Sequence, residues 1–431
     1  MKTLIRDTAI VPMTEKDLVI DKGYIIIEDQ FIKEVGQGEY PEGEYDKVID
    51  GRDYVALPGF INTHTHAAMT LLRGYANDLS LMDWLEKKIF PMEAKLGEEE
   101  IYWGTKLAIL EMIKSGTTCF TDMYFKMDQV AQAVKESGIR AVLSRGMIGV
   151  GPENEEAIED SRALVKKWHH AEDGRIQFML GPHAPYTCPP DYLKRVSALA
   201  AELNVGIHIH LAETVGEYED MQKQYGKTPI ALMEETGVLQ NQVLAAHCVH
   251  MSDEDIQLLK KYNVGVAHNP ESNMKLASGV APVVTMLEAG IPVALGTDGV
   301  SSNNDLDMFQ EMRTAALLQK VQTMDPTVLP AYQALEMATV NGAKALRQEQ
   351  QIGRIKEGMR ADIILVGLQE PHMIPTYDLV ANLVYSGHAS DVQTVFVDGK
   401  MLMENRKFFM DEEEIITRVK EIAERLNRGE A

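Results

Sequence analysis

The chain has 431 residues, of which 45% are hydrophobic and 25% are charged, and this composition excludes disordered, collagen-like and coiled-coil proteins. Asp and Glu number 65 against 42 Lys and Arg, so the formal net charge is −23 at pH 7. A field of that sign repels phosphate, and we therefore expect neither a nucleic-acid partner nor an anionic membrane partner. No run approaches the roughly 18 apolar residues of a membrane span, and no signal-peptide core precedes Asp7, which predicts a cytoplasmic protein.

Short apolar runs alternate with segments of helical periodicity through the middle of the chain, and this alternation is typical of a parallel α/β sheet or barrel. Eight such runs are expected to be strands: 55–66, 117–123, 140–147, 176–184, 206–213, 242–249, 264–270 and 292–299. Eight β/α units predict a TIM-like (β/α)8 barrel, which we place at residues 58–354. The competing doubly wound sheet is disfavoured because Gly146, Gly149 and Gly151 do not form the GxGxxG fingerprint.

The two ends of the chain show a different pattern. Residues 23–35 look like an antiparallel pair of strands, and Asp398 and Gly399 lie between two apolar runs, which is a strong hairpin signal. Because the barrel lies between the two ends, their strands pair most simply with each other. We therefore predict a small β-sandwich domain built from residues 1–57 and 355–431, with an amphipathic surface helix at its C-terminus.

His64 and His66 end the first predicted barrel strand. Side chains at i and i+2 of a strand project to the same side about 7 Å apart along the strand, so the two imidazoles can converge on one ion. Barrel active sites are built at the C-terminal ends of the strands, and the later strands carry further metal-competent side chains there. These side chains are His183, His210, His247, His268 and Asp298. Their common position predicts a metal site on one rim of the barrel.

Two other sets of residues have simpler interpretations. His208 shares the strand face of His210 but lies one layer deeper, so we expect it to pack or to form a hydrogen bond. Cys119, Cys188 and Cys248 lie far apart and form no CxxC pair, which indicates neither a disulfide framework nor a thiolate metal site. We expect these thiols to be reduced and mostly buried.

The ligand types indicate which metal the rim would hold. Imidazole and carboxylate ligands suit Zn²⁺, although Fe²⁺ or Mn²⁺ can take the same donors. A binuclear barrel hydrolase would want a bridging group such as a carboxylated lysine, and strand 176–184 contains no lysine, so we expect one Zn²⁺ per subunit. A metal lowers the pKa of its water to about 7, which supplies hydroxide at working pH. Glu213 lies three residues beyond His210, where it can shuttle protons without being a ligand.

The motifs PGFINTHTH, HLAE, AHC, AHNPESNMKLASG and GTDG resemble those of the amidohydrolase superfamily, over essentially the whole chain. Within the superfamily, the chain is most similar to the 5′-methylthioadenosine/S-adenosylhomocysteine deaminases, which are mononuclear zinc enzymes. The resemblance implies hydrolytic deamination at C6 of the adenine ring, which yields ammonia and an inosine-type nucleoside. The implied metal ligands are His64, His66, His210 and Asp298, and the implied catalytic residues are Glu213, His247 and Asp298.

The resemblance also implies contacts with the substrate. Trp84 and Glu93 would lie over the ribose and the thioether, with Glu93 accepting hydrogen bonds from the ribose hydroxyls. Arg145 would face the homocysteine carboxylate, and His183 would contact the nucleoside. The implied substrate-binding set is Trp84, Glu93, Arg145, His183, Glu213 and Asp298.

Other functions are left open by the sequence. The first alternative is another aminohydrolase or halide hydrolase of this superfamily, acting on guanine, cytosine or a triazine, but Glu213 favours deamination of a ring that needs N-protonation. Amide-ring hydrolases rank lower because the bridging lysine is absent. A catalytically inactive barrel that serves as a scaffold would have lost its metal ligands, which are all present here. The expected partner is a small adenosine-type substrate, and homo-oligomerisation is left open.

Overall fold

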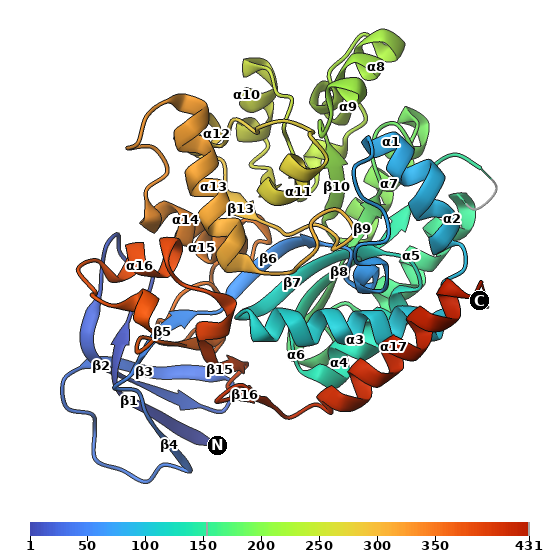
Figure 1. Cartoon of the computed structure of the whole chain (residues 1–431). Helices are drawn as coiled ribbons and strands as arrows, with labels where there is room; N and C mark the ends of the chain where they lie inside the picture. The colour runs from blue at the N-terminus through green and yellow to red at the C-terminus, as the bar shows by residue number, and fades with distance from the viewer. Residues whose placement is uncertain (152–153, 430–431) are drawn as a thin grey trace.

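A computed structural model describes residues 1–151 and 154–429 of the chain. Within these ranges, eight parallel strands form one sheet in chain order (Figure 1). They are β6 (Phe60–Thr65), β7 (Thr117–Tyr124), β8 (Arg140–Met147), β9 (Ile176–Pro182), β10 (Ile207–Leu211), β11 (Val243–His247), β12 (Gly265–His268) and β13 (Val293–Leu295). Thr63 Oγ1 donates to Leu295 O at 2.8 Å, and Asp298 N donates to His64 O at 2.9 Å. These bonds join the first and last strands, so the sheet is a nearly closed barrel and the predicted TIM-like fold is confirmed.

Helices follow the strands and cover the outside of the barrel (Figure 1). In the described part of the chain they are α1 (Leu81–Trp84), α2 (Phe90–Glu93), α3 (Glu98–Lys114), α4 (Met127–Ser137), α5 (Asn154–Trp168), α6 (Ala171–Gly174), α7 (Pro190–Leu203), α8 (Val215–Tyr225), α9 (Pro229–Glu235), α10 (Asp253–Lys261), α11 (Pro270–Lys275), α12 (Val283–Glu288), α13 (Met308–Thr323), α14 (Ala331–Ala338), α15 (Val340–Ala345), α16 (Leu379–Tyr385) and α17 (Glu412–Asn427). Local sequence fixes several of their ends: Ser252 caps α10 by accepting the N–H of Asp255 at 3.1 Å.

Several barrel strands end earlier than the sequence predicts. Predicted strand 206–213 stops at Leu211 because Ala212 adopts left-handed backbone, with φ of 52°, and in predicted strand 292–299 the strand ends at Leu295 and Asp298 is left-handed, with φ of 61°. His247, the last residue of β11, has φ of 73°. Left-handed backbone costs a non-glycine residue about 1 to 2 kcal/mol, and such strain is typical of functional sites. The chain therefore turns out of the sheet at the rim where the polar side chains gather.

The two ends of the chain form a second sheet. In the described residues its strands are β1 (Lys2–Ile10), β2 (Ile20–Glu28), β3 (Phe31–Gln37), β4 (Lys47–Asp50), β5 (Tyr54–Pro58), β14 (Ile363–Gly367), β15 (Val392–Val397), β16 (Lys400–Glu404) and β17 (Lys407–Phe408). Antiparallel pairing of β5 with β14 joins the two ends. Ile25 and Ile27 of β2 share one apolar cluster with Ile363 and Phe396 of β14 and β15, although β5 and β1 lie between β2 and β14 in the sheet, so the sheet curls over its own core. The predicted small β domain is confirmed, as one curled sheet.

The predicted strand 55–66 is in fact two strands that belong to different sheets. β5 lies in the small sheet and β6 begins the barrel, and Gly59 separates them. A Cβ atom on Gly59 would lie 2.1 Å from the side chain of Thr118, so only glycine fits where the chain crosses between the sheets. The apolar run is continuous because both strands are buried, and periodicity alone does not reveal the division.

The C-terminal helix α17 packs against the barrel helix α3, as Figure 1 shows. Its buried side chains Ile415, Ile422 and Leu426 lie on one face, as the amphipathic pattern predicts. Arg425 Nη2 lies 3.1 Å from Glu99 Oε2 at the start of α3. The helix that we grouped with the small β domain therefore makes its contacts with the barrel.

A buried ion-pair network links the barrel to the small sheet. Arg140 begins β8, at the barrel end opposite the polar rim, and its side chain is 1% exposed. Its Nε donates to Asp362 Oδ2 at 2.8 Å, and its Nη2 pairs with Asp398 of the β15–β16 hairpin. Two separate segments of the small domain are thus held by one barrel residue.

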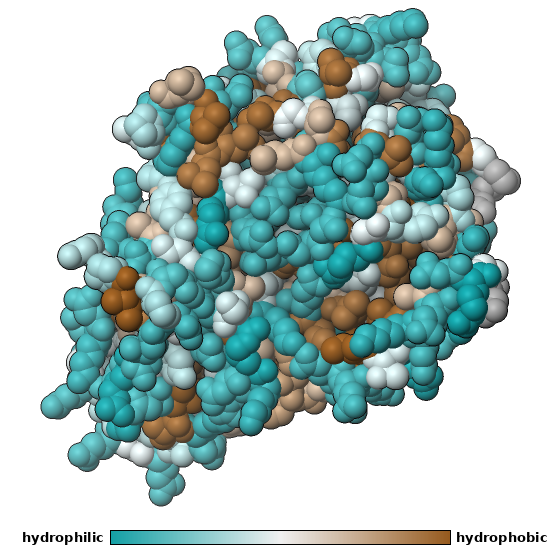
Figure 2. All heavy atoms as spheres, viewed as in Figure 1, coloured by the Kyte–Doolittle hydropathy of each residue, from teal (hydrophilic) through white to brown (hydrophobic). Residues whose placement is uncertain are grey.

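The outer surface matches the acidic composition. Figure 2 shows that hydrophilic residues cover most of the face seen there, with hydrophobic residues in smaller groups. Among the described residues, no helix combines the length and hydropathy needed to cross a membrane.

Candidate active site

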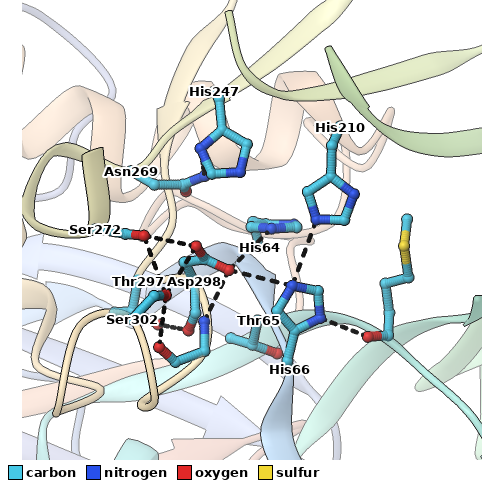
Figure 3. Close-up of polar contacts among 12 residues, drawn as sticks. His64, Thr65, His66, His210, His247, Asn269, Ser272, Thr297, Asp298 and Ser302 are labelled. Carbon is cyan, nitrogen blue, oxygen red and sulfur yellow. Dashed lines mark hydrogen bonds and ion pairs between the residues drawn. The ribbon is translucent and has the colours of Figure 1, made fainter. Parts of the chain in front are cut away.

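Imidazole rings and one carboxylate converge at the C-terminal rim of the barrel (Figure 3). His66 Nε2 lies 3.1 Å from Asp298 Oδ1 and 3.4 Å from His210 Nε2. His64 Nε2 lies 3.3 Å from the same Asp298 oxygen. The ligand atoms of His64, His66 and His210 all lie within 4.8 Å of one another, as do those of His64, His247 and Asp298. The structure thus brings together the four side chains that the sequence singles out as metal ligands.

Hydrogen bonds at Nδ1, on the side of the ring away from the centre of the site, fix the orientation of these histidines. His66 Nδ1 donates to Met123 O at 2.6 Å, and His210 Nδ1 donates to His183 O at 2.7 Å. Because a carbonyl oxygen only accepts, both Nδ1 atoms carry the proton in these bonds, and the Nε2 lone pairs face the centre. His64 Nδ1 is hydrogen-bonded to His208 Nε2 at 2.8 Å. His208 thus forms a hydrogen bond below the ligand group, as we expect of it from the sequence.

The electrostatics of the group favour a bound cation. Burial lowers the pKa of His64 to about 4 and holds the pKa of His210 well below its usual value, so both rings are neutral at pH 7. Burial would raise the pKa of Asp298, but the adjacent imidazole rings of His64 and His66 outweigh it and hold that pKa well below its usual range. His64 Nε2 is buried without a hydrogen-bond partner. A cation held by imidazole nitrogens and a carboxylate would satisfy all of these atoms.

Hydrogen-bond donors from helix α11 and from the loop after β13 orient the Asp298 carboxylate (Figure 3). Ser272 Oγ and Ser302 Oγ donate to Asp298 Oδ2 at 2.7 and 3.0 Å. The N–H of Gly299 donates to Oδ1 at 2.8 Å. Donors to both oxygens favour the ionised carboxylate and fix its plane. The sequence analysis missed both serines, because a single serine carries no signal of its own, whether it lies in a short helix, as Ser272 does, or in a loop, as Ser302 does.

Glu213 and His247 lie together beside the metal-ligand group. Glu213 Oε2 lies 3.8 Å from His247 Nε2, and Ser278 Oγ donates to Glu213 Oε1 at 3.4 Å. Burial raises the pKa of Glu213, which favours the protonated carboxyl. His247 Nδ1 donates to Asn273 Oδ1 at 2.9 Å, which turns Nε2 toward the site. The pair can therefore carry a proton and orient a water at the rim.

Glu217 supports this arrangement from below and is a second residue that the sequence analysis missed. Its carboxylate accepts the N–H of Ala212 at 2.8 Å and the N–H of Glu213 at 2.9 Å. Burial raises the pKa of Glu217 to about 7. These bonds satisfy the backbone of the left-handed turn after β10 and so fix the direction of the Glu213 side chain.

A cavity of about 1170 Å³ opens in front of the rim. Trp84, Glu93, Arg145 and His183 all line it, together with residues of the rim. Burial raises the pKa of Glu93. Arg145 Nη1 donates to Gly146 O at 2.7 Å, and His183 shares a hydrogen bond of 3.0 Å with Thr187 Oγ1. The residues that we expect to bind substrate thus face one space, which is large enough for a nucleoside with a side chain.

The amidohydrolase family model matches residues 55–402. The chain belongs to the amidohydrolase family. A 5-methylthioadenosine/S-adenosylhomocysteine deaminase of Syntrophomonas wolfei is 63% identical to this amidohydrolase over 428 residues, or 99% of both chains. The second such deaminase, of Desulforamulus reducens, is 53% identical, again over 99% of both chains. The family resemblance that the motifs carry is therefore confirmed over the whole length.

Solved structures agree with this assignment. The crystal structure of an adenosine deaminase from Xanthomonas campestris with bound zinc matches this amidohydrolase with a TM-score of 0.95 and 34% identity, covering 99% of this chain and 98% of that one. An atrazine chlorohydrolase from Arthrobacter aurescens TC1 complexed with zinc is 25% identical with a TM-score of 0.92, covering 98% and 100%. Zinc in both relatives and the converging side chains here mark the rim of this amidohydrolase as a metal site.

Among the described residues, two members of the predicted rim, His183 and His268, are not brought into the ligand groups of this amidohydrolase. His268 ends β12 and is fully buried, but among the described residues neither group of close ligand atoms includes it. Both of its ring nitrogens are buried without a hydrogen-bond partner. Burial lowers the pKa of His268 to about 3, so the ring is neutral at any working pH.

Proposed function

We propose that this amidohydrolase hydrolytically deaminates the adenine ring of 5′-methylthioadenosine and S-adenosylhomocysteine at C6. Ammonia leaves, and an inosine-type nucleoside is formed. The full-length similarity to the Syntrophomonas wolfei deaminase carries this proposal. The cavity supports it, because it combines a proton carrier at the rim with a carboxylate and a guanidinium further out, as a charged nucleoside requires.

The proposed cofactor is one Zn²⁺ per subunit, held by His64, His66, His210 and Asp298. Three imidazoles and one carboxylate suit Zn²⁺ and leave room for water, and Fe²⁺ or Mn²⁺ can take the same donors. The absence of lysine from β9 supports one ion rather than two, since that strand offers no bridging carbamate. When bound, the ion lowers the pKa of a water to about 7 and so supplies the nucleophile at working pH.

Three side chains would carry the protons and charges of the reaction. Asp298, kept ionised by its donors, accepts a proton from the attacking water. His247 orients that water through Nε2 and, once protonated, stabilises the negative charge that develops as C6 is attacked. Glu213 donates its proton to ring N1, which makes C6 electrophilic. Asp298 or Glu213 then returns a proton to the departing amine.

Four cavity residues would position the substrate. Glu93 accepts hydrogen bonds from the ribose hydroxyls, and Trp84 covers the ribose and the thioether. His183 contacts the nucleoside next to the rim, where its ring lies 4.9 Å from that of His210. Arg145 pairs with the carboxylate of the homocysteine tail.

We also propose the domain limits 1–57 with 355–431 for the small β domain and 58–354 for the barrel, and a cytoplasmic location. The change of sheet at Gly59 supports the first limit. The proposed partner is a small adenosine-type substrate, and homo-oligomerisation is left open.

A steady-state comparison of ammonia release tests the proposed function. The substrates are adenosine, methylthioadenosine, S-adenosylhomocysteine, guanine and an amino-substituted triazine. We expect kcat/KM to be highest for the two thioether nucleosides. Turnover of guanine or the triazine without turnover of any adenosine-type substrate would overturn the proposal in favour of the alternative hydrolase.

A further inference from the structure

The outer part of the cavity contains an ion pair between the barrel sheet and a helix. Arg145 extends from β8 and Asp160 from α5, and both line the cavity. Arg145 Nη2 lies 3.5 Å from Asp160 Oδ2, and the two side chains are 16% and 50% exposed. A guanidinium has five N–H groups, and the contacts with Asp160 and Gly146 O engage only one on each Nη atom. Donors of Arg145 are therefore left for a ligand in the cavity.

We propose that Asp160 binds the α-ammonium group of S-adenosylhomocysteine, next to the carboxylate that Arg145 holds. This inference rests on the proposed function and adds the second charge of the substrate tail to it. In an α-amino acid, the ammonium and the carboxylate are attached to one carbon. Their binding partners must therefore be neighbouring groups of opposite charge, and the Arg145–Asp160 pair has this arrangement.

The surroundings of the pair single out Asp160 among the cavity carboxylates. Asp128 Oδ1 already accepts hydrogen bonds from Lys167 Nζ at 2.6 Å and Trp168 Nε1 at 2.7 Å. Glu156 lies one helical turn before Asp160 on α5 and also lines the cavity. Among the described residues, however, only Asp160 lies within ion-pairing distance of Arg145.

The same face of α5 also provides an apolar surface for the rest of the tail. Ala157 and Leu164 line the cavity from the turns before and after Asp160. Methylene groups of the homocysteine chain can lie against these side chains while the charged end reaches the ion pair. The helix thus offers both kinds of contact that the tail needs.

The test compares four thioether nucleosides that carry different charges. S-adenosylhomocysteine has both charges, its analogue without the α-amino group has only the carboxylate, 5′-(3-aminopropylthio)adenosine has only the ammonium, and methylthioadenosine has neither. Values of kcat/KM are measured on the metal-loaded Asp160→Asn and Arg145→Met variants. Glu159→Gln is the matched control, because it removes one negative charge from an exposed neighbour on α5 that does not line the cavity.

We expect Asp160→Asn to lower kcat/KM about tenfold, relative to methylthioadenosine, for the two substrates that carry the ammonium. The expected loss in kcat/KM is at the lower end of the range for a charge-assisted hydrogen bond, because Asp160 is half exposed. Arg145→Met should lower kcat/KM roughly 10- to 150-fold for the two substrates that carry the carboxylate. Glu159→Gln should keep the wild-type ratios among all four substrates.

Several outcomes would overturn the inference without touching the proposed function. If Asp160 merely competes with the substrate for Arg145, Asp160→Asn will raise kcat/KM for the carboxylate substrates. Equal losses of kcat/KM on all four substrates would show that Asp160 has a structural role. A loss selective for the ammonium substrates with Glu156→Gln, but not with Asp160→Asn, would show that Glu156 binds the ammonium instead. A wild-type enzyme that accepts methylthioadenosine but rejects the charged tails would also overturn it. Failure on every adenosine-type substrate would instead overturn the proposed function itself.

Discussion

The rings of His66 and His210 are held by backbone carbonyls that belong to neighbouring strands. Met123 O and His183 O fix the two Nδ1 atoms, so the ligand atoms are oriented before any ion arrives. The framework that orients them is the barrel itself, whose strands pack through apolar side chains elsewhere. Loss of one ligand should therefore empty the metal site while the fold persists.

We predict that His66→Ala and Asp298→Asn each lose the bound metal and the activity. His66→Ala deletes a ligand nitrogen and Asp298→Asn replaces the anionic carboxylate with a neutral amide, in a set in which every member is buried or nearly so. Metal content and ammonia release are measured on the same preparations, with circular dichroism to show that the barrel is folded. Either variant that keeps full turnover at normal metal content would refute the ligand assignment.

Metal analysis needs one precaution in this protein. His372, His388 and Asp391 form a second group whose ligand atoms lie within 4.8 Å of one another, far along the chain from the rim. Loosely held ions at such a surface group would add to the total. Metal content is therefore compared before and after a chelating resin, and a His372→Ala background serves as the control.

Glu213→Gln should keep its metal but lose about 10² to 10⁴ in kcat, because the amide fills the same space and cannot carry a proton. Its backbone is held independently by Glu217, so the loop position should be unchanged. Metal content and turnover are measured together. Loss of zinc from this variant would mean that Glu213 is a ligand and that the proposed coordination is wrong.

Residues at strand ends could be found from the sequence, and residues that support them could not. His64, His210 and Asp298 are visible because each follows a recognisable apolar strand and carries a metal-ligating group. Ser272 acts through a contact with Asp298 that depends on how α11 packs next to the end of β13. Asp160 looks like any charge on an amphipathic helix until its pairing with Arg145 is seen.

At the scale of elements, the turn after β10 sets the position of Glu213, the proposed proton carrier. Ala212 is left-handed there, and the carboxylate of Glu217 from the first turn of α8 accepts the N–H groups of Ala212 and Glu213. Thr214 starts α8 by accepting the N–H of Glu217 at 3.1 Å. Strand, turn and helix are thus joined by a reciprocal set of hydrogen bonds.

The buried Glu217 predicts a pH-dependent stability. Burial raises its pKa from 4.5 to about 7, so the native state binds more protons than the unfolded state between these values. The free energy of unfolding of the wild type should therefore fall, relative to Glu217→Gln, by up to about 3 kcal/mol as the pH rises from 4.5 to 7. Chemical denaturation at several pH values measures the difference.

Glu219→Gln is the matched control for this prediction, because Glu219 is an exposed glutamate of the same helix. It should keep the wild-type dependence on pH. A difference between wild type and Glu217→Gln that stays constant across this range would show that Glu217 does not titrate there.

The order of strands could be predicted from the sequence, but their division between sheets could not. The apolar run 55–66 contains no polar residue pattern that marks the change of sheet at Gly59. Steric contact with Thr118, which comes from a strand that is distant in sequence, sets the crossing point. The amphipathic pattern of α17 likewise predicts which face is buried, but not that α3 is the helix it covers.

At the scale of the whole molecule, Arg140 is the main polar link between the barrel and the small sheet. Arg140→Met should destabilise the protein by about 3 to 5 kcal/mol, because it leaves the buried carboxylate of Asp362 without its cation, whereas Asp398 keeps Arg360 at 3.0 Å. Denaturant unfolding of the holoenzyme measures the loss. The triple variant that adds Asp362→Asn and Asp398→Asn should recover part of it, and a triple variant less stable than the single one would contradict the argument.

The pairing of β5 with β14 also means that β5 is synthesised long before its partner strand. About 300 residues separate the two strands, and a ribosome that adds about 5 to 20 residues per second needs roughly 15 to 60 s to make them. During that interval β5 presents an unpaired hydrogen-bonding edge next to the apolar side of β1. The newborn chain therefore passes through a period in which another strand can occupy that edge, and this enzyme should rely on chaperones before its last 70 residues are made.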